Sequence, residues 1–145
     1  MVVLKGINDD ELEDFIKFSK EYDLIVRFIE YMPIVLNEKW KRYFISREEI
    51  IQKISSFIDF RAYPYENYSD PSRYFYLNKG GEAGIINPVS HGFCHNFDRL
   101  RLTADGFLRS CLTHDIEIDV KTPLRENARD EVISEFFKKA VLFKP

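Results

Sequence analysis

The chain has 145 residues, of which 45% are apolar and 31% are charged, and its formal net charge is −3 at pH 7. This composition is typical of a soluble globular domain with a core, and the small net charge provides no general attraction to nucleic acid or membranes. No apolar run approaches the roughly 18 residues of a membrane span, and the start has no signal-peptide pattern. We expect a cytoplasmic protein with reduced thiols and with neither a membrane nor a nucleic acid as partner.

The first segments predict a strand, a helix and a second strand. The start, MVVLKGIND (1–9), has the pattern of the end of a buried strand that enters a helix. The helix continues to about Tyr22 and is opened by a predicted capping box of Asn8 and Glu11. The run DLIVRFIEYMP at 23–33 is almost continuously apolar, which favours a parallel strand covered on both faces. This order of elements is typical of an α/β protein.

The remaining segments predict an α+β arrangement with an antiparallel sheet. Residues 37–43 have the pattern of an irregular basic connection, and Ser46 with Glu49 forms a second capping box that opens a helix. Apolar residues recur at helical spacing from Asp130, which predicts a closing helix. Short strands are predicted at RYFYL (73–77), EAGIINPVS (82–90) and the two arms around Ala104–Gly106.

The turn at Ala104–Gly106 determines the register of its two arms. A three-residue loop pairs Thr103 with Phe107, Arg101 with Arg109 and Arg99 with Cys111, whereas a two-residue loop mixes polar and apolar residues on both faces. The three-residue loop is favoured because it separates the two kinds of side chain. Its apolar face holds Leu100, Leu102, Leu108 and Leu112, and its polar face holds Arg99, Arg101, Arg109 and Cys111.

The arginines on this polar face have two possible explanations. Like charges at neighbouring cross-strand positions repel, so stability alone does not favour the arrangement. A polyphosphate would relieve the repulsion, because guanidinium groups bind phosphate oxygens in pairs. The alternative is a solvated cationic face with Asp98 and Glu117 as ion-pair partners.

The stretch FCHNFDRLRLTADGFLRSCL at 93–112 carries a family resemblance. It resembles the C-terminal signature of the GTP 3′,8-cyclases of molybdenum cofactor biosynthesis, which are radical S-adenosylmethionine (SAM) enzymes. That signature has Cys-x2-Cys, an Arg-x-Arg pair, a TxDG turn and a third cysteine. The blocks VLKGINDDEL, VRFIEYMP and GIINPVSHGFC also resemble consecutive blocks of the family, in the same order. The signature positions are occupied here by Cys94, Phe97, Arg99, Arg101 and Cys111.

The resemblance implies a fold and a division of the chain. Residues 1–33 would be the last βα unit of an incomplete TIM-like barrel. Residues 34–145 would form a C-terminal region with an antiparallel sheet and helices, which holds the auxiliary cluster and GTP. In the family, one [4Fe–4S] cluster cleaves SAM, and a second, auxiliary [4Fe–4S] cluster lies where GTP binds. The resulting lyase reaction gives 3′,8-cyclo-7,8-dihydro-GTP.

The resemblance also implies roles for individual residues. Cys94 and Cys111 would be ligands of the auxiliary cluster. Met32 would help to hold SAM, with simple packing as the alternative. The implied GTP contacts are Arg27, Arg99, Leu100 and Arg101. For Arg27, the alternative is an ion pair with Glu30 or with a loop acid. No catalytic residue is assigned to the chain itself.

Three departures from the family pattern limit these implications. The Cys-x3-Cys-x2-Cys motif that would hold the SAM cluster is absent, and the chain contains only two cysteines. Phe97 stands at the position of the third auxiliary ligand, although a phenyl ring offers no lone pair to iron. The chain ends in Phe-Lys-Pro instead of the family's frequent glycine pair. We therefore expect a fragment, a truncated product or one half of a split protein.

Two functional hypotheses remain open. The first is the C-terminal part of a GTP 3′,8-cyclase, whose activity needs the missing N-terminal half. The second is a truncated non-catalytic remnant that self-associates through an open sheet edge and binds nucleotide or structural zinc. The spacing His91-x2-Cys94 and Cys111-x2-His114 resembles a Cys2His2 zinc site. His95, next to Cys94, is a weaker candidate for a replacement cluster ligand.

Overall fold

The chain folds into two compact units, Met1–Phe93 and Cys94–Pro145. The computed structural model describes residues 1–34, 38–64, 70–78, 80–91, 99–112 and 116–143. Within these ranges the class is mixed α/β, with one mixed sheet and one separate antiparallel sheet. The predicted combination of α/β and α+β features is therefore confirmed at this level.

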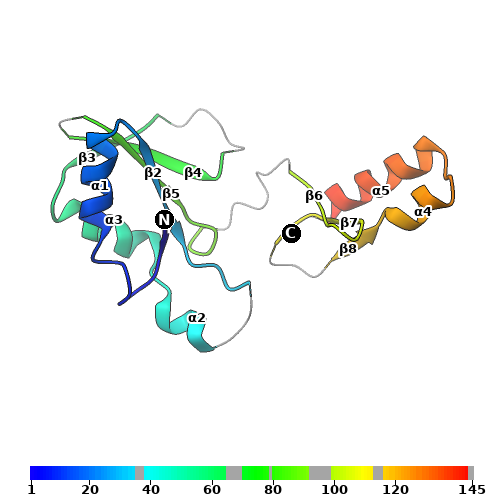
Figure 1. The fold of residues 1–145 in the computed structure, drawn as a ribbon, viewed down its shortest axis with the longest axis horizontal. Coiled ribbons are helices and arrows are strands. Elements are labelled where there is room, and N and C mark those ends of the chain that lie inside the picture. The colour runs from blue at the N-terminus through cyan, green and yellow to red at the C-terminus, as the bar shows by residue number, and fades with distance from the viewer. Residues whose placement is uncertain (35–37, 65–69, 79, 92–98, 113–115, 144–145) are drawn as a thin grey trace. The chain divides into compact units, whose positions relative to one another are not determined.

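The first unit contains a five-stranded mixed sheet (Figure 1). Strand β2 (Ile25–Glu30) is parallel to both of its neighbours, β1 (Val2–Val3) and β5 (Glu82–Ile86), whereas β4 (Ser72–Leu77) is antiparallel to both β5 and β3 (Phe60–Ala62). The predicted strand–helix–strand unit is confirmed, because helix α1 (Leu12–Glu21) connects β1 to β2. The predicted strands at 73–77 and 82–90 also form, but they extend this same sheet. In spatial order the strands are β1 (Val2–Val3), β2 (Ile25–Glu30), β5 (Glu82–Ile86), β4 (Ser72–Leu77) and β3 (Phe60–Ala62).

Helices α1 and α3 (Arg47–Ser55) cover one face of this sheet. Apolar residues recur at helical spacing along both helices, so each helix has one side that can be buried. These sides pack against alternate side chains of the strands, including Phe28, which is completely buried. The core residues contributed by the helices are Leu12, Ile16, Ile50 and Ile54.

The sequence predicted that both faces of β2 are covered. In the structure, the face that points away from α1 and α3 is not covered within this unit. Burial alternates along the strand, so that Phe28 and Glu30 are buried while Ile25 and Arg27 are exposed. Ile25 is 45% exposed. The prediction of a strand covered on both faces is therefore wrong for the described residues, because the helices that pack on the sheet supply only one layer.

The ends of the helices confirm one predicted capping box and contradict the other. Ser46 and Glu49 form the predicted reciprocal contacts at the start of α3. Asn8 does not cap α1, because its amide side chain bonds instead to the backbone of Val2 and Leu4 at 3.0 and 2.7 Å. The predicted irregular connection at 37–43 is also wrong, since Glu38–Tyr43 forms the short helix α2.

The second unit is a three-stranded antiparallel sheet with two helices. The hairpin has the predicted three-residue loop, because Arg101 pairs with Arg109 and the Thr103 N–H donates to the Phe107 carbonyl at 2.9 Å. Gly106 has a φ of +93°, which suits glycine at the end of such a loop. The elements are β6 (Arg101–Leu102), β7 (Phe107–Arg109), β8 (Glu117–Asp119), α4 (Lys121–Arg125) and α5 (Asp130–Leu142).

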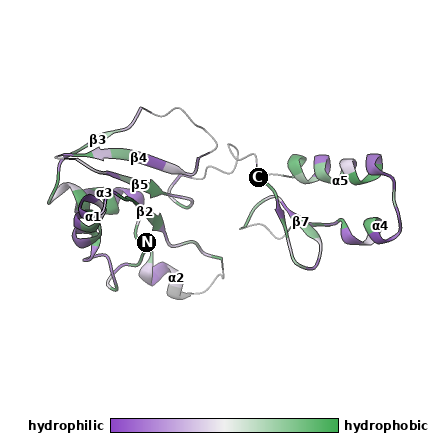
Figure 2. Ribbon diagram, turned by 45° about the horizontal axis from the view of Figure 1, so that its top comes forward, coloured by the Kyte–Doolittle hydropathy of each residue, from purple (hydrophilic) through white to green (hydrophobic). Residues whose placement is uncertain are grey.

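Burial in this unit is less complete than the apolar pattern predicts. Leu108 is buried, but Leu102 opposite it is 66% exposed at the edge of the sheet. The closing helix forms as predicted, and Figure 2 shows hydrophobic and hydrophilic residues alternating along α5. Ala140 is the buried residue of α5, whereas Phe137 and Val141 remain exposed. No helix in the described part of the chain is long and apolar enough to cross a membrane.

The capping box of α3 predicts a pH-dependent contribution to stability. A hydrogen bond from the Lys5 ammonium, followed by one from the Ser46 N–H, lowers the pKa of Glu49 from its ordinary value of 4.5. A lowered folded-state pKa means that the ionised carboxylate stabilises the fold above the unfolded pKa, and that this contribution is lost as the pH falls through the folded pKa. Glu49→Ala should lower the free energy of unfolding by about 0.5–1 kcal/mol at pH 7.

Urea denaturation at pH 7 and at several values below 4.5 measures this effect. The difference between the wild type and Glu49→Ala should shrink as the pH falls. Glu48→Ala is a matched control, because Glu48 lies in the same helical turn but makes no cap contact. Equal losses for the two variants, or a loss that does not depend on pH, would contradict the prediction.

Candidate functional site

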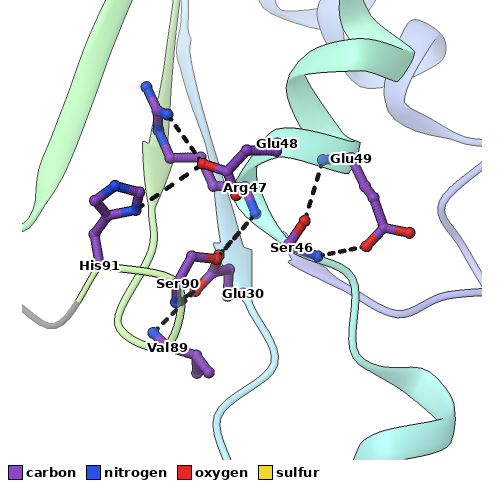
Figure 3. Close-up of polar contacts among 8 residues, drawn as sticks. All are labelled: Glu30, Ser46, Arg47, Glu48, Glu49, Val89, Ser90 and His91. Atoms are coloured by element: carbon purple, nitrogen blue, oxygen red, sulfur yellow. Dashed lines mark hydrogen bonds and ion pairs between the residues drawn. The ribbon is translucent and has the colours of Figure 1, made fainter.

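Glu30 is a buried carboxylate at the carboxyl end of β2 (Figure 3). Its side chain is 1% exposed and accepts hydrogen bonds from two separate segments. The Arg47 N–H, at the start of α3, donates to Oε1 at 2.8 Å. The Val89 and Ser90 N–H groups each donate to Oε2 at 2.9 Å, and the Ser90 hydroxyl donates to Oε1.

These contacts explain why a charged residue is tolerated inside the apolar run 23–33. A buried carboxylate is costly unless its oxygens accept several hydrogen bonds. Here Glu30 has four donors, and one of them is a backbone N–H at a helix N-terminus, where negative charge is favoured. The carboxylate therefore joins the end of β2, the start of α3 and the turn after β5.

The outer part of this cluster consists of contacts that Glu48 makes with Arg47 and His91. Glu48 Oε1 lies 3.3 Å from Arg47 Nη1 and 4.0 Å from His91 Nδ1 (Figure 3). The His91 side chain is 67% exposed, so the pairing is weakened by solvent. His91 belongs to the possible zinc site, but its proposed partners Cys94 and His114 lie outside the described residues. Among the described residues, no group of three His, Cys, Asp or Glu side chains is arranged to hold a metal ion.

The side chain of Arg27 contacts a tyrosine, Tyr74. Its Nε and Nη2 donate to the Tyr74 hydroxyl at 2.9 and 2.7 Å. The guanidinium also lies 5.3 Å from the centre of the Tyr74 ring. The alternative of an ion pair with Glu30 is therefore wrong, because Arg27 and Glu30 lie on opposite faces of β2. Tyr74 and Asp70 also line a cavity of about 390 Å³.

Met32 follows the carboxyl end of β2, two residues after Glu30. It is half-buried, and its carbonyl accepts a hydrogen bond from the Ile34 N–H at 2.9 Å. In α/β sheets, ligand-binding groups gather at the carboxyl ends of parallel strands. This position does not decide between the SAM contact that the resemblance implies and simple packing.

A row of charges crosses the sheet of the second unit. Arg101 pairs with Arg109, and Arg109 pairs with Glu117 on the next strand. Both Nε and Nη2 of Arg109 contact the Glu117 carboxylate. The two arginines thus share the predicted face, and one of the two predicted acidic partners neutralises Arg109.

The other predicted residues of the second unit lie beside this row. Arg99 is exposed, and Leu100 packs against the core that Leu108 and Ile118 form. Cys111 is 9% exposed and follows β7. The ladder of β6 and β7 ends at Arg101–Arg109, so the predicted pairing of Arg99 with Cys111 is not part of it. Cys94, His95 and Phe97 lie outside the described residues.

The sequence analysis did not identify Tyr74 and Asp70 as site residues. Tyr74 is one of several tyrosines at 62–76, and nothing in the local pattern distinguishes it from Tyr76. Its role depends on strand pairing, because only the register of β2, β5 and β4 brings its hydroxyl to Arg27. Glu30 carried a usable signal, namely an acid inside an apolar strand.

Replacing Glu30 tests the importance of the buried carboxylate. Glu30→Gln keeps the size of the side chain but turns an amide donor toward N–H groups that need acceptors. The free energy of unfolding of the first unit should fall by about 2–4 kcal/mol. The single tryptophan, Trp40, reports on this unit, because its indole donates to the Tyr31 carbonyl at 2.7 Å.

Urea titration followed by tryptophan fluorescence measures the change. Glu48→Gln is the matched control, since this exposed neighbour should shift stability by less than about 0.5 kcal/mol. Similar midpoints for Glu30→Gln and the control would show that the buried carboxylate is not needed for stability.

Comparison with known proteins identifies the family to which the chain is similar. A family model described as Molybdenum Cofactor Synthesis C matches residues 24–145. A GTP 3′,8-cyclase from Thermodesulfovibrio yellowstonii is 43% identical over 146 residues, which cover 100% of this chain and 45% of the relative. A GTP 3′,8-cyclase from Moorella thermoacetica is 42% identical over 151 residues, which cover 100% of this chain and 45% of the relative.

A third relative, the GTP 3′,8-cyclase of Listeria welshimeri, is 36% identical over 148 residues, covering 100% of this chain and 44% of the relative. The chain thus spans less than half the length of the curated relatives that it matches. The resemblance inferred from 93–112 and the three upstream blocks is confirmed. The chain belongs to the Molybdenum Cofactor Synthesis C family.

Proposed function

We propose that this chain is the C-terminal part of a GTP 3′,8-cyclase and contributes residues that bind GTP. The observation that carries the proposal is the row of Arg101 and Arg109 across β6 and β7 in a member of this family. Glu117 pairs with Arg109, and the exposed guanidinium of Arg101 is suited to bind the oxygens of a triphosphate. Arg27, on the exposed face of β2, is a further cation for the phosphates.

The division of labour proposed for the whole protein follows the family. Residues 1–33 supply the end of an incomplete TIM-like barrel, and residues 34–145 supply the auxiliary-cluster and GTP-binding region. Met32 contributes to the SAM site of the complete enzyme. Arg99, Leu100 and Arg101 contact GTP, and the N-terminal half of the curated relatives, which this chain does not cover, is the part with which it acts.

The residues present do not fit a complete auxiliary cluster. Such a cluster needs thiolate or histidine ligands, and Phe97 offers neither. Cys94 and Cys111 are the only thiols in the sequence, so a set of three thiolates cannot be assembled from this chain. No catalytic step through either cluster is assigned to it, and its own residues are proposed to bind and orient the nucleotide.

This mismatch supports a second candidate function. The chain would then be a non-catalytic remnant that binds nucleotide or, through His91, Cys94, Cys111 and His114, structural zinc. The observation that favours it is the phenylalanine at a ligand position. Metal analysis separates the two candidates.

Phe97→Cys tests the cluster assignment by restoring a third thiol. After anaerobic reconstitution, the variant should bind an iron–sulfur cluster, with about four irons per chain, while the natural chain binds much less. Iron and sulfide quantification measure both proteins. Phe107→Cys is a matched control, because it adds a third thiol on the hairpin without completing Cys-x2-Cys.

Two results would contradict this assignment. Equal iron content in Phe97→Cys and Phe107→Cys would mean that the position of the thiol does not matter. Stoichiometric zinc in the natural chain, lost in His91→Ala or Cys111→Ser, would support the zinc site instead.

Arg101→Ala tests the proposed GTP site. Removing one charge-assisted contact should weaken GTP binding about tenfold, as measured by calorimetric titration at low salt. Arg99→Ala should also weaken it. Arg125→Ala, an exposed arginine at the end of α4, is the control and should leave the affinity unchanged. Unchanged affinity in Arg101→Ala would overturn the proposed GTP contact.

A further inference from the structure

Arg27, Gly84 and Tyr74 form a row across three strands of the first sheet. Arg27 pairs with Gly84 on the parallel neighbour β5, and Gly84 pairs with Tyr74 on the antiparallel neighbour β4. Directly paired residues present their side chains on the same face of a sheet. This is the face opposite α1 and α3, where Ile25 is also exposed.

Glycine at position 84 creates the space that the row needs. A Cβ atom at Gly84 would lie 2.3 Å from the Ser72 hydroxyl oxygen and 3.1 Å from Cδ1 of Tyr74. The first distance is shorter than nonbonded atoms can approach. The Tyr74 ring thus packs directly over the glycine backbone, and the long Arg27 side chain extends across β5 to reach it.

The contact between Arg27 and Tyr74 fixes the orientation of the guanidinium. Two of its nitrogens, Nε and Nη2, donate to the same hydroxyl oxygen at 2.9 and 2.7 Å. Two donors from one planar group to one oxygen restrict the rotation of the side chain. The ring lies 5.3 Å from Cζ, which adds a cation–π attraction.

Asp70 orients the tyrosine in turn. The Tyr74 hydroxyl donates its proton to Asp70 Oδ2 at 3.2 Å, which leaves the lone pairs of the hydroxyl to accept from Arg27. The other carboxylate oxygen of Asp70 accepts from the Ser72 N–H at 2.8 Å, so the acid is itself fixed to β4. The result is a chain of contacts from Asp70 through Tyr74 to Arg27.

The remaining guanidinium nitrogen, Nη1, is the group that the contacts with Tyr74 leave to bind a ligand. Within the described part of the molecule, no residue accepts a hydrogen bond from Nη1 of Arg27. Arginine donates five N–H groups in a fixed fork, and a guanidinium held along one edge presents the remaining donors in a defined direction. A preorganised fork of this kind loses less entropy when it binds a phosphate.

We propose that Tyr74 and Asp70 are positioning residues that hold Arg27 for the triphosphate of GTP. This inference rests on the proposed function. Neither residue touches the nucleotide. Their contribution is the fixed direction of the guanidinium, and Gly84 provides the gap that makes the contact possible.

Calorimetric titration of the full chain with GTP and with guanosine tests the proposal. Tyr74→Phe removes only the hydroxyl, and it should weaken GTP binding about three- to tenfold while leaving guanosine binding unchanged. Tyr76→Phe is the matched control, because Tyr76 lies two residues further along the same face of β4 and contacts Tyr63 and Arg61 instead. It should not change either affinity.

A double-mutant cycle shows whether Tyr74 acts through Arg27. Arg27→Ala should weaken GTP binding, and adding Tyr74→Phe should cause no further loss. Asp70→Asn is a second variant that retains the side-chain volume, and it should cause a smaller loss of GTP affinity. It keeps the test available if Tyr74→Phe alters the fold, which Trp40 fluorescence would reveal.

The outcomes separate this inference from the function on which it rests. If Arg27→Ala weakens GTP binding but neither Tyr74→Phe nor Asp70→Asn does, the positioning role is overturned and the GTP site stands. Equal losses for GTP and guanosine would also overturn it, since they indicate general loosening. If the wild-type chain binds no GTP, both proposals fail.

Discussion

The first unit depends on one buried negative charge. Glu30 accepts hydrogen bonds from the start of α3 and from the turn after β5, two segments that are distant in sequence. Without this acceptor, three backbone N–H groups would lose their carboxylate partner at the carboxyl edge of the parallel strands. The same edge carries Met32, and the turn precedes Cys94 in the sequence. A single side chain thus links the end of β2 to the start of α3 and to the turn after β5.

The two faces of the first sheet have different roles. One face is packed by α1 and α3 and contains the apolar core, which stabilises the unit through burial. The other face carries the row of Arg27, Gly84 and Tyr74, in which polar groups satisfy one another at the surface. A charged ligand can reach such a face only where the packing layer is absent, so the one-sided covering and the proposed role of Arg27 belong together.

Local signals predicted the structure well where neighbours in sequence decide it. The Ser46 capping box and the three-residue hairpin loop involve contacts within a few residues, and both are confirmed. Prediction failed where another contact competes, which is local for Asn8 and depends on the sheet for Leu102. Asn8 leaves its expected cap because the backbone of Val2 and Leu4 offers better partners, and Leu102 stays exposed because β6 is an edge strand. Strand β8 is too short for an alternating pattern to be recognised.

The sequence by itself determined the family, the register of the arginine hairpin and the number of thiols. Each of these depends on residue identity and spacing, which folding does not alter. Only the tertiary structure decided which residue contacts Arg27 and which N–H groups donate to Glu30. Both depend on strand order and register, since β5 lies between β2 and β4 and brings together residues 47 positions apart in sequence. A local sequence pattern cannot predict that pairing, because the same strands in another order would bring different side chains together.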